Sequence, residues 1–412
     1  MALGKRSEHA PPAGDVRESP RALRVLFLAP GDVSKGRVEP ITWMQTCRAY
    51  AQRGAEVTLV TLRVRRPDAI PADSVWAHFG LPASFRIIAV PTLLGHDAPT
   101  RWFRLNAGLP ALALALGTVA GQAVRPRNII VHARAPVLAA PFALVGRLLP
   151  KRRRPHLLLE THSLPKKTNG WIVRSADLVV VNSQKLALDM TRHFGLSPER
   201  VLFAPLGPHN RIHRHDKTAA RVELGLPTEG AIACFAGKLT EEQNEFLLAA
   251  AVQLAHEVPH FLFVLMGGNP RIAAWTRRKI DELGVSDSVL LTGFVAPSRV
   301  DLYLAAADVL VYHVPSSVPT FAYCTPAKGY DYQAAGRPIV ATDIPLFEEV
   351  FGRDGERAIR VVERTPQALA AGVVQAFKLE DGGRAMTERA AAWTKERTWE
   401  RRTRLILQSF GI

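Results

Sequence analysis

Short continuous runs of apolar residues alternate with longer segments of mixed character along most of the chain. Such runs are typical of strands that a parallel sheet buries on both faces. The segments between them are long enough for helices, and one at residues 39–53 is followed by Gly54, a residue type that favours a helix end. We therefore expect the α/β class, with helices on both faces of parallel sheets. The runs are 24–29, 56–62, 85–90, 128–133, 156–160, 177–181, 231–237, 261–267, 288–293, 308–312 and 338–342.

The runs fall into two sets, which indicates two domains. At 412 residues the chain is longer than one hydrophobic core usually supports. The break lies near Gly207, so we expect an N-terminal Rossmann-like domain over residues 22–206 and a C-terminal one over residues 207–394. Doubly wound domains of this kind bind ligands where their strands end, here in a cleft between the two. Residues 1–21 lack the apolar core of a signal peptide, and we expect a disordered tail there.

Residues 325–349 combine a helix start, a helix end and a buried strand. Thr325 supplies a hydroxyl for the cap and Pro326 suits the first turn, whereas Gly336 stops the helix. The first turn of a helix presents unpaired N–H groups and a partial positive charge, so it suits a phosphate. An ordinary helical connection between two strands is the alternative interpretation.

Two side chains of the same helix have chemistry that fits a nucleotide. Lys328, in the first turn, adds a full positive charge beside a phosphate. Asp331, one turn later, can accept a hydrogen bond from a ribose hydroxyl. The segment therefore predicts a site for a nucleoside diphosphate.

Excess positive charge is confined to the first half of the chain. Residues 1–215 contain 31 Lys and Arg against 13 Asp and Glu, whereas the remainder contains 22 against 24. The basic residues concentrate at 63–66, 151–154 and 166–167. They lack the interleaved aromatic residues of a nucleic-acid module, so no nucleic-acid partner is expected. An anionic membrane surface and a solvated basic surface without a partner are both open interpretations.

Residues 105–124 carry no charge, and their length invites comparison with a transmembrane helix. Alanine and glycine dominate the segment, and Pro110 interrupts it. We therefore expect a buried or partly membrane-dipping helix pair.

Cysteine and histidine spacing supports neither a disulfide framework nor a metal site. The three cysteines lie far apart, which fits a protein of the reducing cytosol. No D-x-D, G-x-S-x-G or G-x-G-x-x-G motif is found, so a metal-dependent transferase, a serine hydrolase and a dinucleotide-binding turn are not expected. The cysteines are Cys47, Cys234 and Cys324, and the histidines of the interdomain loop, expected at the surface, are His209, His213 and His215.

The segment around Lys328 resembles the nucleotide-sugar site of the retaining GT-B glycosyltransferases of family 4, also called group 1. Their pattern P-x-K-x-x-E-Y-x-A-x-G-x-P recurs here with Asp331 in place of the usual Glu. An earlier carboxylate of the family falls at Tyr323, as in other members with the same variant. The resemblance covers residues 22–412 and implies the GT-B fold. The matching residues are Pro326, Lys328, Asp331, Tyr332, Ala334, Gly336 and Pro338.

The resemblance assigns further residues to the donor site. Gly237 and Lys238, at the end of a predicted strand, match a glycine and a cation of the family that bind the donor diphosphate. The resemblance also places the helix start at Ala327 against this diphosphate. A second family cation falls at Gln243, which can donate only as a neutral dipole.

The loop after residues 288–293, by the same resemblance, receives the nucleobase. Phe294 would supply an apolar contact, and the backbone of Val295 the hydrogen bonds. A position in the core is the alternative for Phe294.

In the N-terminal half the resemblance points to the loop after the first strand, where Gly36 permits close approach of the backbone to the donor phosphate. His132 is expected beside the transferred sugar and His162 across the cleft, and with Lys238 they are the candidate catalytic residues. Glu160 is a further candidate for positioning an acceptor hydroxyl. A satisfied structural role is the alternative for each histidine.

Residues 395–412 form an amphipathic pattern rich in arginine. The pattern resembles the final helix of GT-B enzymes, which crosses back to the N-terminal domain, and Trp399 matches the aromatic residue that marks the crossing. Packing on its own domain is the alternative.

The resemblance implies transfer of a sugar from a nucleoside diphosphate sugar to a glycan or lipid-linked acceptor, with retention of configuration and without a metal ion. Together with the cysteine usage and the basic first half, it indicates a cytoplasmic enzyme of polysaccharide biosynthesis, peripheral on the inner face of the cell membrane. The departures at Gln243 and Asp331 leave open a catalytically silent GT-B protein that binds a glycan or a partner enzyme. A GT-B nucleotide-sugar epimerase is the second alternative.

Overall fold

The computed structural model describes residues 23–35, 38–63, 70–71, 73–91, 100–124, 128–209, 215–319, 321–323, 325, 327–353 and 356–412. The tail expected over residues 1–21 lies outside the described residues. So do Gly36, His213, Cys324 and Pro326.

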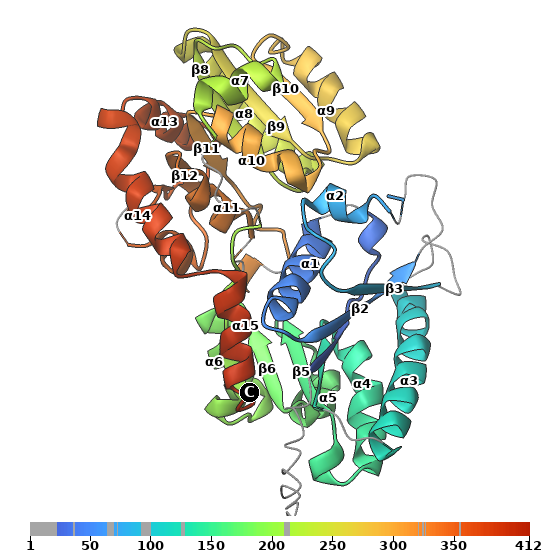
Figure 1. Ribbon diagram of the computed structural model, residues 1–412. Helices are drawn as coiled ribbons and strands as arrows, with labels where there is room; N and C mark the ends of the chain where they lie inside the picture. The colour runs from blue at the N-terminus through green and yellow to red at the C-terminus, as the bar shows by residue number, and fades with distance from the viewer. Residues whose placement is uncertain are drawn as a thin grey trace, which may run out of the picture.

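The first domain is built on a seven-stranded parallel sheet with the order β3-β2-β1-β4-β5-β6-β7 (Figure 1). The chain starts near the middle and winds outward in both directions, so the strand order reverses between β1 and β4. A doubly wound sheet opens a crevice for ligands at this point. The strands are β1 (Arg24–Leu28), β2 (Glu56–Arg63), β3 (Arg86–Pro91), β4 (Ile129–Ala133), β5 (His156–Thr161), β6 (Leu178–Val181) and β7 (Val201–Phe203).

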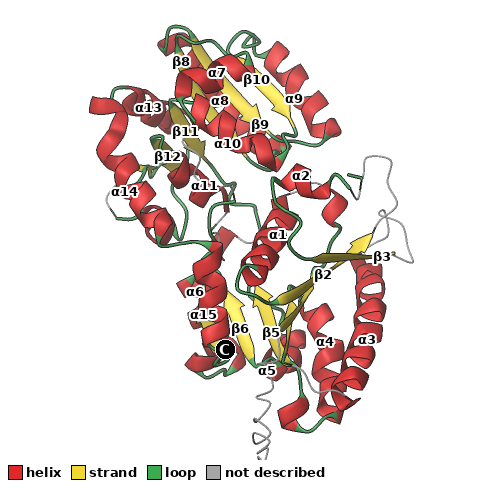
Figure 2. Cartoon of the chain, in the orientation of Figure 1, coloured by secondary structure: helices red, strands yellow, loops and turns green. Residues whose placement is uncertain are grey.

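The second domain repeats this plan with a six-stranded parallel sheet of order β10-β9-β8-β11-β12-β13 (Figure 2). Each apolar run of the sequence forms one of the strands, which confirms the predicted α/β class with two parallel sheets. The short β7 and β13 escape the pattern because three residues do not make a recognisable run. The strands are β8 (Ala231–Ala236), β9 (Phe261–Met266), β10 (Val289–Gly293), β11 (Val309–Tyr312), β12 (Ile339–Thr342) and β13 (Ile359–Val361).

Helices cover both faces of the first sheet. On one face Tyr50 of α1 and Ile406 of α15 are buried in a common core with β1 and β2. This face carries α1 (Val38–Ala51), α2 (Val75–Phe79) and α15 (Trp399–Gln408). The opposite face carries α3 (Thr100–Val124), α4 (Pro136–Val145), α5 (Gly170–Ser175) and α6 (Gln184–Phe194).

The uncharged segment 105–124 lies in the single helix α3 rather than in the expected helix pair. Pro110 removes one backbone donor inside this helix but does not end it, because α3 packs along α4 (Figure 1). Among the described helices, none has the length and apolar character that crossing a bilayer would require.

The second sheet is covered in the same way. Local sequence sets the helix ends: the Thr240 hydroxyl caps α8 by accepting from the backbone N–H of Gln243, and Gly336 follows α11 with φ of +70°. One face carries α7 (Lys217–Leu224), α10 (Pro297–Ala306), α11 (Ala327–Ala335) and α12 (Phe347–Phe351). The other carries α8 (Glu241–Glu257), α9 (Pro270–Glu282) and α13 (Pro366–Phe377).

The end of the chain connects the two domains. The helix α14 (Arg384–Lys395) packs on α11 of the second domain, and α15 then packs on α1 of the first. The Trp399 indole N–H donates to the carbonyl of Pro208 at 2.7 Å, and the buried Arg402 donates to the carbonyl of Ala204. The last helix is therefore part of the core of the first domain.

Candidate active site

Two glycine loops meet at the carboxyl edge of the second sheet. Gly237 follows β8 and Gly267 follows β9. A Cβ atom on Gly267 would lie 2.0 Å from the carbonyl oxygen of Gly237, and the φ of Gly267 is +128°, so only glycine fits there. Because these glycines have no side chain, the backbone of the two loops can approach each other and a ligand closely.

Lys328 reaches this edge from the first turn of α11. Its ammonium donates to the carbonyl oxygen of His313 at 3.0 Å and lies 4.2 Å from the centre of the Phe235 ring. A Cβ atom on Gly237 would lie 3.3 Å from the same ammonium nitrogen. The structure thus brings together Lys328 and Gly237, two residues assigned to the diphosphate.

Lys238 and Ala327 complete this end of the site. The Lys238 side chain is exposed, one residue beyond Gly237. Ala327 opens α11 and packs in one cluster with Ala49 of α1 and Leu206 of the interdomain connection. The first turn of α11 therefore lies where the two domains meet.

Gln243 requires a correction. Its side chain is only 4% exposed, and its amide nitrogen donates to the carbonyl oxygen of His313 at 2.8 Å. It was assigned to the donor diphosphate, but the amide instead fixes the backbone at the end of β11. The position corresponds to the third residue of α8, and a neutral side chain of this length reaches a neighbouring carbonyl before it reaches the cleft.

Phe294 and Val295 follow β10, and their side chains have different surroundings. Val295 is partly buried against the core of the second domain. The Phe294 ring is 53% exposed and lies parallel to the His78 ring of α2, with ring centres 5.9 Å apart. Phe294 is therefore not a core residue, and its ring faces the first domain.

Asp331 and His209 form a pair between α11 and the interdomain connection, and the position of His209 differs from its prediction. One Asp331 oxygen accepts from the His209 backbone N–H and the other lies 2.6 Å from His209 Nδ1. His209 is 5% exposed, so it does not lie at the surface as expected. The carboxylate assigned to a ribose holds the interdomain connection instead, because the chain returns from β7 directly over α11.

His132 also departs from its predicted role beside the sugar. It is fully buried on β4, with Nε2 2.7 Å from a Glu160 oxygen and Nδ1 3.3 Å from the Tyr50 hydroxyl. Both faces of this sheet are covered by helices, so alternate residues of a central strand all point into a core. The imidazole is closed off from solvent in this structure.

Glu160 is the centre of a buried charged cluster. Its carboxylate accepts from Arg134, from His162 at 2.8 Å and from His132, and it forms an ion pair with Arg402 of α15 at 2.7 Å. Glu160 itself is 2% exposed, so it is not placed to touch an acceptor hydroxyl as proposed from the sequence. The partly exposed members are Arg134 and His162, which follow β4 and β5 at the carboxyl edge.

The charges of this cluster follow from its contacts. Burial alone would raise the pKa of Glu160, but Arg134 and Arg402 outweigh burial and hold that pKa well below its usual range. Burial, with the charge of Arg134, lowers the pKa of His162 to about 4, and burial also lowers the pKa of His132. At neutral pH the cluster therefore contains two cations, one anion and two neutral imidazoles.

A direct contact between domains lies beside the donor helix. The Asn182 amide, at the end of β6, donates to the Thr325 hydroxyl at 2.8 Å. The backbone N–H of Gln184 donates to the Glu349 carboxylate at 3.2 Å. Thr325 therefore bonds to the first domain next to α11, in a place where sequence analysis expected only a helix cap.

Several residues of the buried cluster and of the contact between the domains were not found from the sequence. Arg134 follows His132 at a spacing of two, and its position just past a strand was a usable signal. Asn182, Arg402 and Glu349 gave no local signal, because their partners lie more than a hundred residues away in the chain.

Comparison with known proteins agrees with this arrangement. A family model described as Glycosyltransferase Family 4 matches residues 41–207, and one described as Glycosyl transferases group 1 matches residues 230–378. The two models follow one another along the chain. The first covers β2 to β7 of the first sheet and the second covers all six strands of the second sheet.

Curated relatives are similar to part of the chain. A D-inositol 3-phosphate glycosyltransferase of Acidothermus cellulolyticus is 28% identical over 53% of this chain and 49% of its own length. Its counterpart from Geodermatophilus obscurus is 30% identical over 49% of this chain and 46% of its own length. The chain thus spans about half the length of the curated relatives it matches.

Solved structures extend the similarity of fold to nearly the whole chain. Sucrose-phosphate synthase from Thermosynechococcus elongatus superposes with a TM-score of 0.66 at 18% identity, covering 95% of this chain and 98% of its own. HepE from Anabaena, in complex with UDP and glucose, gives 0.65 at 16% identity, covering 93% and 99%. With two glycosyltransferase family models over its two sheets, the chain belongs to the family 4, group 1 glycosyltransferases and has the GT-B fold.

Proposed function

We propose that the protein transfers a sugar from a nucleoside diphosphate sugar to a glycan or lipid-linked acceptor with retention of configuration. The observation that carries this proposal is the position of the Lys328 ammonium beside Gly237, with the exposed Lys238 next to it. Transfer requires stabilisation of the charge that develops on the leaving diphosphate. Two ammonium groups and the backbone of a glycine loop can supply it.

The acceptor side of the proposal rests on the first sheet. Arg134 and His162 follow neighbouring strands at its carboxyl edge, and both are partly exposed. We place the acceptor against these two side chains, with His162 neutral at pH 7 because its pKa is lowered to about 4 by burial. Neither side chain needs to accept a proton for this role.

We further propose that Lys238 and Lys328 provide the positive charge without a resident metal ion. The described residues contain no cluster of three His, Cys, Asp or Glu side chains suited to a metal. A chelator added to a transfer assay tests this directly: activity that survives supports the proposal, and activity restored only by a divalent cation contradicts it.

The proposed setting is the cytoplasmic surface of an anionic membrane, in the biosynthesis of a polysaccharide. Two buried cysteines, Cys47 and Cys234, are unpaired thiols, in keeping with a reducing compartment. The basic first half of the chain supports the membrane surface.

A thermal-shift titration with UDP, GDP, ADP and their common sugars tests the donor site, because a ligand that binds only the folded state raises the melting temperature. UDP is the first probe, since HepE is in complex with UDP and glucose. The Lys238→Ala variant should reduce transfer at least about tenfold, or about 1.4 kcal/mol. Unchanged turnover removes Lys238 from the mechanism.

A second candidate is a catalytically silent GT-B protein. It is favoured by the engagement of Gln243 with His313 and of Asp331 with His209, which removes two expected donor contacts. This alternative predicts no thermal shift with any nucleotide and no donor turnover. The proposed transferase predicts a thermal shift with its nucleotide and turnover of the donor.

A further inference from the structure

The outer face of α3 is apolar. Leu109, Leu112 and Leu116 are 49%, 36% and 51% exposed, and their spacing of three and four residues places them on one side of the helix. A helix at the surface of a soluble domain normally carries charged or polar residues on its outer side. Here the sequence has no charged residue from 105 to 124, so the exposed side of α3 in this segment carries no charge.

The neighbouring helix extends this surface. The end of α4 and the turn that follows it (Gly146–Leu148), which pack beside α3, expose Leu144 and Leu148. We call the five exposed leucines the leucine face: Leu109, Leu112, Leu116, Leu144 and Leu148. Exposed apolar side chains on two helices that pack together are typical of an interaction site.

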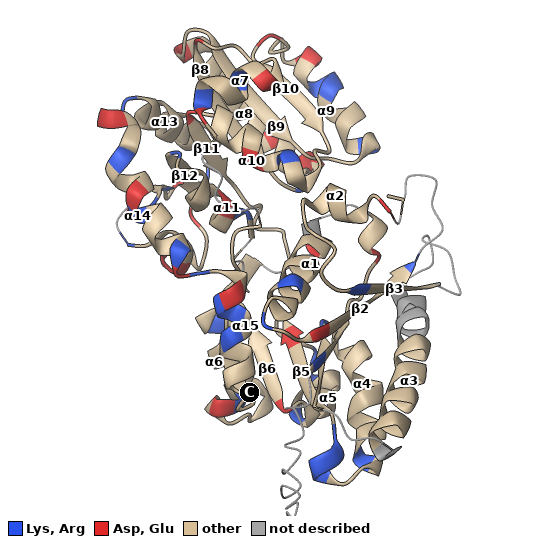
Figure 3. Cartoon of the chain, in the orientation of Figure 1, with Lys and Arg blue, Asp and Glu red and all other residues tan. Residues whose placement is uncertain are grey.

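The charge of the same region has one sign. Residues 98–159, which contain α3, β4 and α4, include ten Lys and Arg and no Asp or Glu. Arg147, Lys151 and Arg152 are exposed, and Figure 3 shows basic residues at the lower end of the α3–α4 pair. These leucines lie near cations, and no acidic residue lies close to them in the sequence. This combination complements a surface that has an apolar interior and an anionic outer layer.

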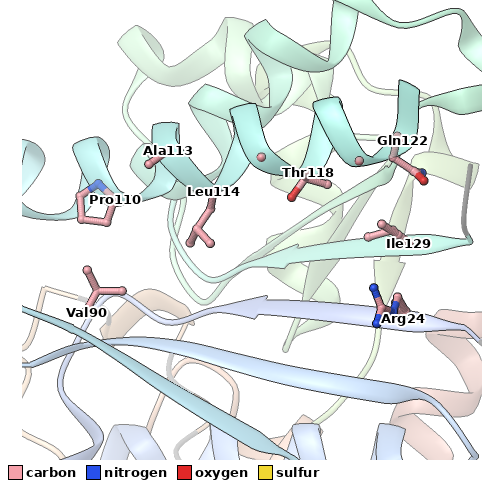
Figure 4. Close-up of a pocket in the computed structure, with 10 residues that line it drawn as sticks. Arg24, Val90, Pro110, Ala113, Leu114, Thr118, Gln122 and Ile129 are labelled. Atoms are coloured by element: carbon pink, nitrogen blue, oxygen red, sulfur yellow. The ribbon is translucent and has the colours of Figure 1, made fainter. Parts of the chain in front are cut away.

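The underside of α3 is loosely filled. A cavity of about 540 Å³ lies between α3 and the strands β1, β3 and β4. Its lining combines apolar side chains such as Val90 and Leu114 with the polar Thr118, Gln122 and Arg24 (Figure 4). A Cβ atom on Gly117 or Gly121 would meet no atom of the described residues within 4 Å.

We propose that the leucine face, with Arg147, Lys151 and Arg152, docks on an anionic lipid bilayer. Leucine side chains enter the acyl boundary, and the basic side chains meet anionic headgroups, an attraction that salt weakens. The inference rests on the proposed function only in that it names the partner surface on which a lipid-linked acceptor would be met. Binding to vesicles needs no nucleotide, so the two ideas fail separately.

The test is co-sedimentation of the full chain with phosphatidylcholine vesicles, with and without phosphatidylglycerol. Wild type should bind only the anionic vesicles, less so at high salt. Leu112→Glu with Leu116→Glu, and separately Lys151→Glu with Arg152→Glu, should each weaken binding at least about tenfold. Matched controls in the second domain, Leu283→Glu and Arg277→Glu with Arg278→Glu, change an exposed leucine and two exposed arginines and should bind like wild type.

Equal vesicle binding by the α3 variants and the controls contradicts the proposal, as does absence of binding by wild type at low salt. Light scattering after size exclusion tests the alternative occupant of the leucine face, which is a second copy of this chain. If wild type is a dimer that the leucine variants convert to a monomer, and no form binds vesicles, the leucine face is an interface between copies and the bilayer proposal is wrong. Nucleotide thermal shifts of all variants should equal that of wild type, which shows that the donor domain is intact.

Discussion

Lys328 and Gln243 donate to the same carbonyl oxygen, that of His313, at 3.0 and 2.8 Å. This oxygen directly follows β11, so both side chains hold the same point of the sheet edge. They differ in charge and in burial. The amide of Gln243 is closed off inside the domain, whereas Lys328 brings a full charge beside Gly237. The charge available to a diphosphate at this point is therefore that of Lys328, reinforced by Lys238.

Replacing Lys328 by methionine should keep the packing against Phe235 and remove the charge. We expect transfer, or nucleotide affinity measured by thermal shift, to fall at least about tenfold, about 1.4 kcal/mol. Lys279→Met, on the exposed side of α9, is the matched control and should behave like wild type. Full activity of Lys328→Met would show that the diphosphate does not meet this ammonium.

Asp331 distinguishes a ribose contact from an interdomain contact. Asp331→Ala and His209→Ala should each lower the free energy of unfolding by about 1–3 kcal/mol, since each leaves a largely buried polar partner without its hydrogen bond. The double variant should cost less than the sum, because the same pair is broken. Nucleotide affinity should be unchanged in all three. A tenfold loss of affinity, by contrast, at about 1.4 kcal/mol with unaltered stability, supports the ribose role.

Arg402→Leu tests the buried cluster. Removing this guanidinium leaves Glu160 with one arginine fewer inside the core, and we expect about 3–5 kcal/mol lower stability in denaturant unfolding. The adjacent Arg401 pairs with Glu396 at the surface, so Arg401→Leu should change stability by less than about 1 kcal/mol. Equal effects of the two variants would mean that the cluster does not support the fold.

Stability should fall on acidification from pH 6.5 toward pH 4. Burial lowers the folded-state pKa of His162 to about 4, whereas an unfolded histidine titrates near 6.5. The unfolded chain then binds more protons, so stability rises with pH across this window by up to about 1.4 kcal/mol per unit and levels off above it. The melting temperature of His162→Gln should depend less steeply on pH. A residual slope is expected from His313, whose pKa burial lowers to about 3.

The sequence predicted the proximity of Gly237 and Lys328 for a simple reason. Gly237 follows a strand and Lys328 lies in the first turn of a helix, both at the carboxyl edge of one parallel sheet. The pattern of apolar runs is enough to place that edge. The same reasoning placed His132 and His162 near one edge. It could not predict that His132 is buried and His162 partly exposed, because the burial of a strand residue depends on which helices cover its face of the sheet.

The residues that departed from prediction have partners far away in the chain. Asp331 lies 122 residues from His209, and Gln243 lies 70 residues from the carbonyl that it holds. Their chemistry suited a nucleotide equally well, so residue type alone could not decide. Only the path of the interdomain connection over α11 shows which partner a carboxylate meets.

The packing of α15 has a consequence for biosynthesis. Ile406 and Leu407 complete the hydrophobic core of the first domain, and Arg402 completes its charged cluster, although all three lie in α15, which follows the whole second sheet along the chain. A ribosome releases the first two hundred residues long before these arrive. The N-terminal domain therefore keeps an open core face until the second domain has been synthesised and α15 has left the ribosome tunnel.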